Sequence, residues 1–378
     1  MEESFAISCP PFSLQLSHWD MRYIPIYSKR VLCFPLPNSS SEHQEHITQL
    51  LLAALRSTVD ELPFLAGSVV PFSKQQPWLR DLRPHGAAYL EVKDLSRKIN
   101  YLDLRKARFS PSLLDPEELC PFPKAAYIQD SPVDVCRLRV NFVDGGLLLV
   151  VSIIHTVCDG RGISEVLKIF ADKLLKAQAG KLADCLPSRE EAPKHSYSFD
   201  RSSVLSGNGI SGSIENHPCW TASPVTSHSS FATTKTVCTA YHINSDSLRA
   251  LKEAAIPSSP YISTPSATIN IQHPLNGQEV HSSGQSTRIS THDAIAALIW
   301  RSTLLARHRA GLLSNHATTH FSQAVDCRSR LHLPEPYFGN AIYGIKASLT
   351  LPELAPTTER PDTPQISGLQ TAACAIRD

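Results

Sequence analysis

The pair His155 and Asp159 carries the clearest chemistry in the sequence. His155 follows the apolar run Leu147–Ile154, which only Ser152 interrupts, and Asp159 comes four residues later, directly before Gly160. Because the ordinary pKa of histidine is about 6.5, an imidazole held rigidly at the end of a buried strand can accept a proton near neutral pH. Taken alone, the two residues fit equally well a histidine packed in the core and an aspartate that caps the next helix.

A strand, a tight turn and a helix are expected to position this pair. Two β-rich stretches between Leu138 and Ile154 are separated by Asp144-Gly145-Gly146, a turn signal that predicts a hairpin feeding a buried strand. After Gly160–Gly162, apolar residues recur at helical spacing, which predicts a helix beyond the turn. This apolar stripe consists of Ile163, Val166, Leu167, Phe170 and Leu174. The histidine would therefore stand on rigid backbone at the edge of a sheet.

Length and changes in composition predict two domains. A chain of 378 residues exceeds what one hydrophobic core usually supports, although one long domain is possible. We place a first domain at 1–186, a crossing loop or linker rich in Ser, Pro, Gly and His at 187–234, and a second domain at 235–378. Periodicity predicts further helices over Ile47–Val59, Asp246–Ala255 and Thr291–Leu305 and from Ile366 onward, and strands over Thr236–Ile243, Phe321–Val325 and Ile342–Leu349.

Composition and charge argue against several classes of protein. Lys and Arg number 36 against 35 for Asp and Glu, so the net charge of +1 gives no field favouring nucleic acid or an anionic membrane. The run Leu147–Ile154 is too short to span a bilayer, and the N-terminus lacks the pattern of a secretory signal. Ten scattered cysteines without a CxxC pair indicate a reducing compartment. We therefore expect a cytoplasmic, monomeric protein without nucleic-acid or membrane partners.

The other motifs carry less weight. Gly207–Gly212 fits GxGxxG, but no apolar strand precedes it, so we interpret it as a loop. His316 and His320 lie at helical spacing, yet no Glu or Cys completes a ligand set, and no metal site is predicted. Cys158 could be reactive, although a small buried side chain is the commoner role. Neither the GxSxG motif of serine hydrolases nor a phosphate-binding GxxxxGK[ST] occurs.

Five segments carry, in order along the chain, motifs of one family. They are Glu61–Gly67, Val150–Gly160, Ser290–Trp300, Val325–Leu331 and Pro336–Asn340. These segments resemble the PLLAG turn, the HxxxDG motif, the ST…D…W helix and the VDxRxR…P…YFGN block of the BAHD acyltransferases and the wider chloramphenicol-acetyltransferase-like group. One match would be weak, but five in order over residues 10–378 are specific. The pattern is most similar to fungal trichothecene 3-O-acetyltransferase-like enzymes of secondary metabolism. Ile154, in place of a second histidine, distinguishes the chain from peptide condensation domains.

This resemblance implies a fold, a reaction and roles for particular residues. The fold would be α/β, with two chloramphenicol-acetyltransferase-like domains, each a mixed β-sheet flanked by helices. His155 would take the proton of an acceptor alcohol while its oxygen attacks the thioester of acyl-coenzyme A, expected to be acetyl-coenzyme A, directly in a ternary complex. Asp159 would pair with Arg328 to fix the loop, Gly160 would permit a turn that a side chain would obstruct, and Asn340 would support the site.

Three residues of the second domain are candidates for binding coenzyme A. Arg249 and Lys252, on the predicted helix Asp246–Ala255, could meet its phosphates, although a solvated helix face explains them equally well. Ser290 precedes the predicted helix Thr291–Leu305, can cap its first amides and is assigned to the same binding function. Coenzyme A would be a co-substrate, with no resident cofactor and a hydroxylated secondary metabolite as acceptor.

The C-terminal DFGWG motif of the family is not found in these residues. In the family this part supplies strands of the second domain, contacts to coenzyme A and the oxyanion side of the channel. We therefore expect an incomplete second domain, and a truncated, inactive protein of the same fold that only binds a ligand or partner is the alternative to an active O-acyltransferase.

Overall fold

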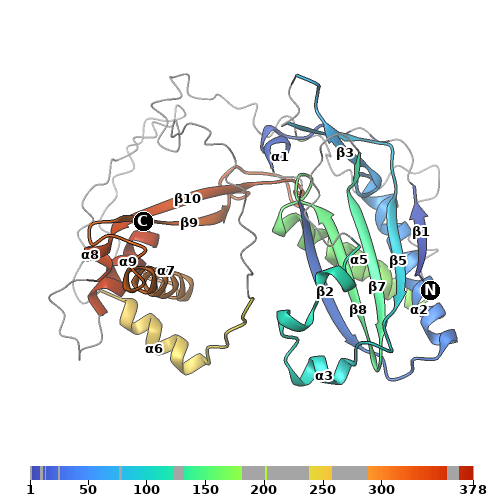
Figure 1. The fold of residues 1–378 in the computed structure, drawn as a ribbon. Coiled ribbons are helices and arrows are strands. Elements are labelled where there is room, and N and C mark those ends of the chain that lie inside the picture. The colour runs from blue at the N-terminus through green and yellow to red at the C-terminus, as the bar shows by residue number, and fades with distance from the viewer. Residues whose placement is uncertain are drawn as a thin grey trace. The chain divides into compact units, whose positions relative to one another are not determined.

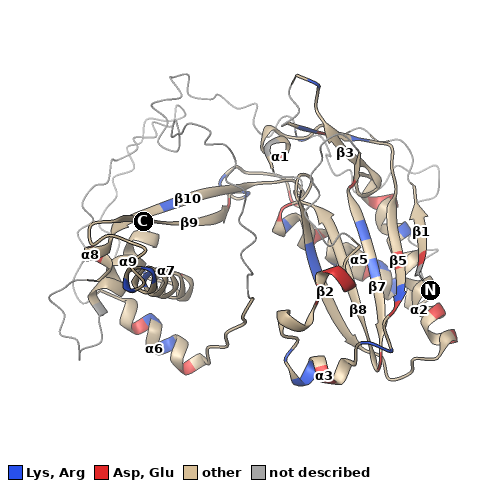
Figure 2. Cartoon of the chain, viewed as in Figure 1, with Lys and Arg blue, Asp and Glu red and all other residues tan. Residues whose placement is uncertain are grey.

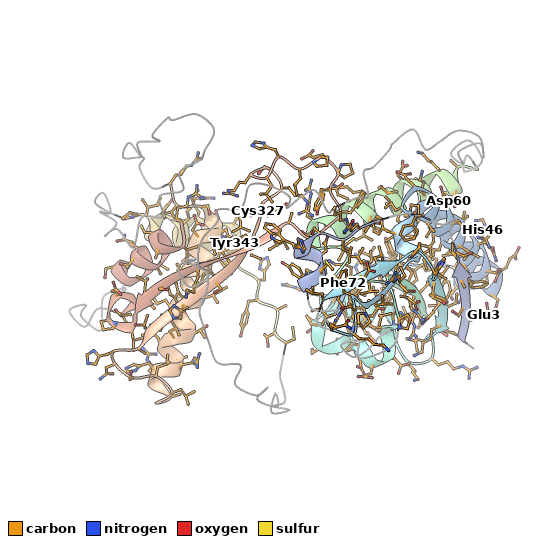
Figure 3. All side chains as sticks on the ribbon, turned by 90° about the horizontal axis from the view of Figure 1, so that it is seen from above. Glu3, His46, Asp60, Phe72, Cys327 and Tyr343 are labelled. Carbon is orange, nitrogen blue, oxygen red and sulfur yellow. The ribbon has the colours of Figure 1, made fainter. Side chains whose placement is uncertain are left out.

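The computed structural model describes residues 2–8, 12, 14–23, 26–75, 79–121, 132–180, 201, 238–257, 288–355 and 366–377. Contacts divide these residues into two compact units. The first contains the described residues within 1–211, 232–240 and 326–342, and the second those within 241–325 and 343–378. Cys327 belongs to the first unit and Tyr343 to the second, as labelled in Figure 3.

A five-stranded mixed sheet organises the first unit, in the order β1-β5-β7-β8-β2 (Figure 1). Its strands are β1 (Glu2–Ile7), β2 (Tyr27–Pro35), β5 (Ala88–Asp94), β7 (Cys136–Val143) and β8 (Gly146–Ile154). Strands β5 and β7 run parallel, whereas the other neighbours are antiparallel. A smaller sheet in the order β4-β3-β6 joins β3 (Ser68–Pro71), β4 (Arg80–Arg83) and β6 (Val133–Asp134).

The predicted hairpin is present as β7 and β8. Val143 pairs with Gly146, and Gly145 takes the turn with φ +73°, a backbone conformation that favours glycine. Every residue of β8 is buried, which agrees with its apolar sequence, in which Ser152 is the one polar side chain. Tyr27 of β2 pairs with Ile154, so the central hairpin and its neighbour end together just before His155.

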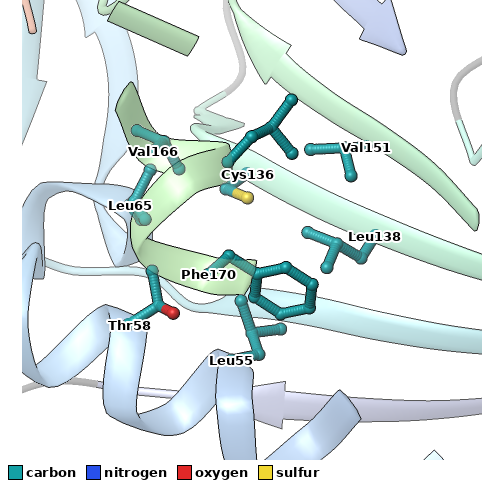
Figure 4. A pocket seen from close by; sticks show the side chains of 9 residues that line it. Leu55, Thr58, Leu65, Cys136, Leu138, Val151, Val166 and Phe170 are labelled. Atoms are coloured by element: carbon teal, nitrogen blue, oxygen red, sulfur yellow. The ribbon is translucent and has the colours of Figure 1, made fainter. Parts of the chain in front are cut away.

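Helices α2 (Ser41–Glu61) and α5 (Gly160–Gln178) lie side by side against the sheet, with the 3-10 helix η1 (Pro63–Ala66) following α2. Both helices are where apolar periodicity predicted them. An apolar pocket between them and the sheet is lined almost wholly by aliphatic and aromatic side chains (Figure 4): Leu55, Thr58, Leu65, Cys136, Leu138, Val151, Val166, Leu167 and Phe170. It belongs to the hydrophobic core of the unit, since most of these side chains are members of the core cluster.

Short helices complete the first unit. They are α1 (His18–Arg22), α3 (Tyr101–Lys106), the 3-10 helix η2 (Pro111–Leu113) and α4 (Pro116–Leu119). Side chains of α3 and α4 form a second apolar cluster with Leu148 and Val150 of β8. Charged residues of both signs are spread over the described elements (Figure 2), consistent with the net charge of +1.

The second unit is built from helices and one strand pair. Its elements are α6 (Ser245–Ala255), α7 (Thr291–Arg309), β9 (Thr318–Asp326), β10 (Ile342–Thr350), α8 (Leu351–Leu354) and α9 (Ile366–Arg377), except that the strand ends Asp326 and Ile342 belong to the first unit. Helix α7 packs against α6 and α9, and its apolar side chains lead the core of this unit. Thr319 bonds to Leu349 and His320 to Ser348, so β9 and β10 run antiparallel. A mixed sheet was predicted for each domain, whereas the described part of this unit has two antiparallel strands.

Two expectations about the chain differ from the structure, and two others lie outside the described residues. The predicted strand Thr236–Ile243 is wrong over residues 238–243, which are exposed and form no strand. An alternating sequence pattern forms a strand only where a neighbouring strand pairs with it. Residues 326–342, expected in the second domain, pack with the first unit. The predicted linker 187–234, Arg201 excepted, and the loop Gly207–Gly212 lie outside the described residues.

None of the described helices is both long and apolar enough to cross a membrane.

Candidate functional site

His155 is the first residue after β8, and its backbone and ring are held by different contacts. Its backbone N–H donates to the carbonyl of Ile26 at 2.8 Å. The half-buried imidazole stacks on the ring of Tyr23, with 4.7 Å between centroids and 4° between planes. Its Nδ1 is buried and has no hydrogen-bond partner among the described residues. The stacked tyrosine is therefore the contact that defines the plane of the ring.

Asp159 caps α5 and forms a buried ion pair with Arg328, the arginine predicted for it. Its Oδ1 accepts bonds from the Gly162 amide at 2.9 Å and from the Arg328 guanidinium at 2.8 Å, while its Oδ2 accepts from the Ala341 amide at 3.1 Å. Asp159 is 0% exposed. Both oxygens are therefore occupied by groups other than His155, and no contact recorded for the described residues joins this carboxylate to the imidazole.

Arg328 connects three parts of the first unit. Besides Asp159, its guanidinium donates to the carbonyls of Tyr337 at 3.0 Å and Gly339 at 2.7 Å, and to Asp326 at 3.0 Å. Burial alone would lower the pKa of Arg328, but the hydrogen bonds and negative charges of Asp159 and Asp326 raise it. The guanidinium thus stays charged where it binds the loop.

The turn after His155 depends on a different glycine from the one predicted. A Cβ at Gly160 would meet only the end of the Arg30 side chain, at 3.7 Å, and the backbone there is not in the left-handed region. At Gly162, in contrast, a Cβ would collide with the backbone carbonyl of Phe338. The expected role of Gly160 is therefore wrong, and the glycine that packing requires is Gly162.

Asn340 binds the backbone beside the histidine and is itself held by a buried carboxylate. Its Nδ2 donates to the carbonyls of His155 at 2.9 Å and Thr156 at 3.2 Å, and to Oδ1 of Asp20 at 2.8 Å. The backbone N–H of Asn340 donates to the same Oδ1 at 2.7 Å. The next amide, that of Ala341, is the one bound by Asp159. Two carboxylates distant in sequence thus hold adjacent amides of the segment 326–342.

Two other ionisable groups beside the histidine are kept neutral. Cys158 is fully buried, and burial raises its pKa to about 12. A thiol with such a pKa is neither a nucleophile nor a base near neutral pH. Burial and the negative charges of Asp159 and Asp20 raise the pKa of Tyr23, so the ring that stacks on His155 is a neutral phenol.

The three candidates for coenzyme A binding lie in the second unit. Ser290 caps α7 in a reciprocal capping box, in which its Oγ accepts from the Asp293 amide and the Asp293 carboxylate accepts from the Ser290 amide. Arg249 is exposed and pairs with Asp246 on its own helix at 3.2 Å, and Lys252 lies in the last turn of α6. These contacts explain Ser290 and Arg249 within their helices, and binding of coenzyme A by all three stays a prediction.

Sequence reasoning missed Asp20, Tyr23 and Gly162. A local signal existed for Asp20, because Ser17-His18-Trp19-Asp20 has the spacing of a capping box, and both of its reciprocal bonds are present. That pattern predicts a helix start but gives no sign of the contact with Asn340, which lies 320 residues away. No sequence pattern indicates the stacking of Tyr23 or the close approach of Phe338 to Gly162.

Comparisons with known proteins agree with this fold. A family model described as the trichothecene 3-O-acetyltransferase-like N-terminal domain matches residues 26–173, and one described as the transferase family matches residues 129–363. Among solved structures, TRI101 of F. sporotrichioides complexed with coenzyme A and T-2 has a TM-score of 0.65 at 21% identity, covering 97% of this chain and 73% of that one. F. graminearum TRI101 complexed with ethyl coenzyme A gives 0.64 at 20% identity, covering 99% and 76%. The predicted two-domain α/β fold is confirmed.

The curated relatives are fungal proteins of differing length. The chain is 45% identical over 380 residues to the enoyl-CoA isomerase/hydratase claC of Penicillium crustosum, covering 100% of this chain and 39% of that protein. It is 32% identical over 181 residues to the acyltransferase BOA11 of Botryotinia fuckeliana, covering 46% and 38%. It is 26% identical over 355 residues to the O-acetyltransferase astG of Aspergillus oryzae, covering 89% and 71%. The chain thus spans well under half the length of the first two relatives.

The transferase model matches more than half of the chain, and the model of the trichothecene 3-O-acetyltransferase-like domain matches the part that contains His155 and Asp159. The chain therefore belongs to the transferase family, and its residues 26–173 are similar to the trichothecene 3-O-acetyltransferase-like N-terminal domain.

Proposed function

We propose that the chain is an acyl-coenzyme A-dependent O-acyltransferase that acetylates a hydroxylated secondary metabolite, with His155 as general base. The observation that carries the proposal is the placement of His155: a half-buried imidazole at the end of a buried strand, with its ring stacked and its backbone bonded on both sides. Relatives named O-acetyltransferases and neighbours complexed with coenzyme A support the acetyl donor. The eremophilane O-acetyltransferase prx11 of Penicillium rubens supports a hydroxylated secondary metabolite as acceptor.

The reaction needs one proton transfer in each direction. His155 takes the proton of the acceptor hydroxyl as the hydroxyl oxygen forms a bond to the thioester carbonyl carbon. The carbon–sulfur bond then breaks, and the sulfur leaves as a thiolate that receives the proton back from the imidazolium. The products are an ester and free coenzyme A. Because a thiolate is a good leaving group at an ordinary thiol pKa of about 8.5, one base suffices.

Direct transfer in a ternary complex is part of the proposal. Cys158 follows the histidine by three residues, and its burial and raised pKa make it unsuited to form an acyl-enzyme. Both substrates should therefore bind before either product leaves. Intersecting double-reciprocal lines support this order, whereas parallel lines or an acyl adduct on Cys158 contradict it.

The name of claC, an enoyl-CoA isomerase/hydratase, points to a different reaction of a coenzyme A thioester. Because the chain matches 39% of that protein, the name describes a protein of which most lies outside the match.

We propose in addition that the protein is cytoplasmic and monomeric, and that Arg249, Lys252 and Ser290 contribute to binding coenzyme A.

The test is a mass-spectrometric screen of acyl-coenzyme A donors against hydroxylated acceptors, with His155→Ala as the matched control. Acetyl ester formation by the wild type and its loss in the variant support the proposal. Equal turnover by both proteins overturns the role of His155. Retained coenzyme A binding without any transfer would indicate the alternative, a binding protein of the same fold.

A further inference from the structure

Residues of the short helix α1 and others that follow it make three direct contacts with His155 and its neighbour Thr156, and a fourth, indirect one. The Ile26 carbonyl accepts the His155 amide at 2.8 Å, and the Tyr23 carbonyl accepts the Thr156 hydroxyl at 3.5 Å. The Tyr23 ring stacks on the imidazole. Asp20 reaches the same place indirectly, because it binds the Asn340 side chain that donates to the His155 carbonyl. Tyr23 and Ile26 therefore contact this part of the chain directly, and Asp20 acts on it through Asn340.

Asp20 is buried, and its carboxylate is surrounded by hydrogen-bond donors. It is 0% exposed, and its Oδ2 accepts the Ser17 amide at 3.1 Å and the Ser17 hydroxyl at 2.8 Å. Its Oδ1 accepts both nitrogens of Asn340, and the Arg201 guanidinium lies 3.6 Å from Oδ2. A carboxylate removed from water is stable only with such a set of donors. Loss of its charge would weaken the bonds that orient Asn340.

Tyr23 provides the contact that the histidine ring otherwise lacks. A histidine base is usually oriented by a hydrogen bond to its second nitrogen, but Nδ1 of His155 is buried without such a partner among the described residues. Rotation about the side-chain bonds of His155 would therefore be limited by stacking on a neutral phenol ring. The hydroxyl of Tyr23 is not needed for this contact, so phenylalanine should replace it.

We propose that Asp20 and Tyr23 are positioning residues, which orient the His155 imidazole from α1 through Asn340 and through ring stacking respectively. This inference rests on the proposed function for its kinetic readout, but the geometry of the ring can be tested without turnover. Neither residue touches a substrate in the proposal. Each acts through His155, so its loss should lower kcat more than it raises KM.

The experiment compares Asp20→Asn, Tyr23→Leu and Tyr23→Phe with Glu91→Gln. Glu91 is a matched control, since it is a buried carboxylate of the same unit that binds Arg137 and Arg139 and contacts none of the residues above. We expect kcat to fall on the order of tenfold to hundredfold in Asp20→Asn and Tyr23→Leu, as for a base displaced by about 1 Å. Tyr23→Phe should retain wild-type kcat, and Glu91→Gln should retain kcat with a lower melting temperature.

A second readout reports on the ring itself. Diethyl pyrocarbonate modifies accessible imidazoles, and peptide mass spectrometry gives the rate at His155. This rate should rise severalfold in Tyr23→Leu and stay unchanged in Tyr23→Phe and Glu91→Gln. An unchanged rate in Tyr23→Leu, or kcat values in both test variants equal to that of Glu91→Gln, would overturn the proposal.

The kinetic and the chemical-modification measurements together distinguish failure of this inference from failure of the proposed function. Wild-type transfer with undiminished kcat in the variants rejects positioning and leaves the acyltransferase in place. Absence of transfer in the wild type rejects the function, and the modification rates then decide alone whether Tyr23 orients the ring. If Asp20→Asn does not fold, the Tyr23 pair, which exchanges one aromatic contact, decides the matter.

Discussion

Asp159 and Asp20 are two fully buried carboxylates that hold the same segment by different means. Asp159 hydrogen-bonds its guanidinium partner Arg328 at 2.8 Å, whereas Asp20 pairs with Arg201 at the longer distance of 3.6 Å and takes its hydrogen bonds from amides and a hydroxyl. Asp159 holds the turn after His155, and Asp20 holds the side chain that binds the His155 carbonyl. The ion pair of Asp159 with Arg328 therefore stabilises the loop as a structure, while the hydrogen bonds of Asp20 bear on the orientation of the base.

Loss of the base itself should mark the upper limit of the effect that either carboxylate can have on turnover. His155→Ala should lower kcat by about two to four orders of magnitude, the usual contribution of a general base. The fold should be little affected, because the half-buried imidazole follows the strand rather than filling the core. Turnover and thermal unfolding of the purified variant check both statements, and a large drop in melting temperature would show that the ring supports the fold.

Of the changes at the carboxylates Asp159 and Asp20, Asp159→Asn should lower the stability of the fold the most. It leaves the buried Arg328 guanidinium with the half-exposed Asp326 as its remaining carboxylate, and breaking a buried pair in this way costs about 3–5 kcal/mol. Chemical denaturation measures the loss. Because the charge of Arg328 causes it, the added substitution Arg328→Met should recover part of the stability, and a fully additive double variant would contradict the pair.

The glycines of the turn offer a comparison within three residues of sequence. Gly162→Ala should cost about 1–3 kcal/mol, as is usual for overpacking, because its Cβ would meet the rigid backbone of Phe338. Gly160→Ala has open space and sits at the start of α5, so its stability should change by less than about 0.5 kcal/mol. Denaturation of both variants checks the difference, and equal losses would show that the turn itself requires glycine at 160.

How much could be predicted from the sequence follows from the range over which each contact acts. The hairpin, α2, α5 and α7 were predicted because apolar periodicity and turn residues act within one element. The Asp159–Arg328 contact, over 169 residues, was predicted only because the motifs of a family linked the two positions. Asp20 and Tyr23 were missed because their contacts join distant segments without a repeating pattern. Gly162 was missed for a steric reason, since only the packed structure brings the Phe338 carbonyl against it.

A small effect is expected at Asp326, the second acidic partner of Arg328. Its distance of 3.0 Å is close to that of Asp159, but its side chain is 48% exposed, so water already solvates the charge. Exposed pairs contribute about 0–1 kcal/mol, and Asp326→Asn should therefore cost far less than Asp159→Asn.

The contribution of Asp326 should also depend on pH. Burial opposes ionisation of Asp326, yet its bonds from Arg328 lower its pKa below the ordinary value. A lowered carboxyl pKa means that this small stabilisation is present above the unfolded pKa, near 3.9, and is lost as the pH falls through the folded value. Denaturation of wild type and Asp326→Asn at pH 7 and pH 3 should show a difference that shrinks on acidification. A loss at pH 7 as large as that of Asp159→Asn would show that burial does not separate the two partners of Arg328.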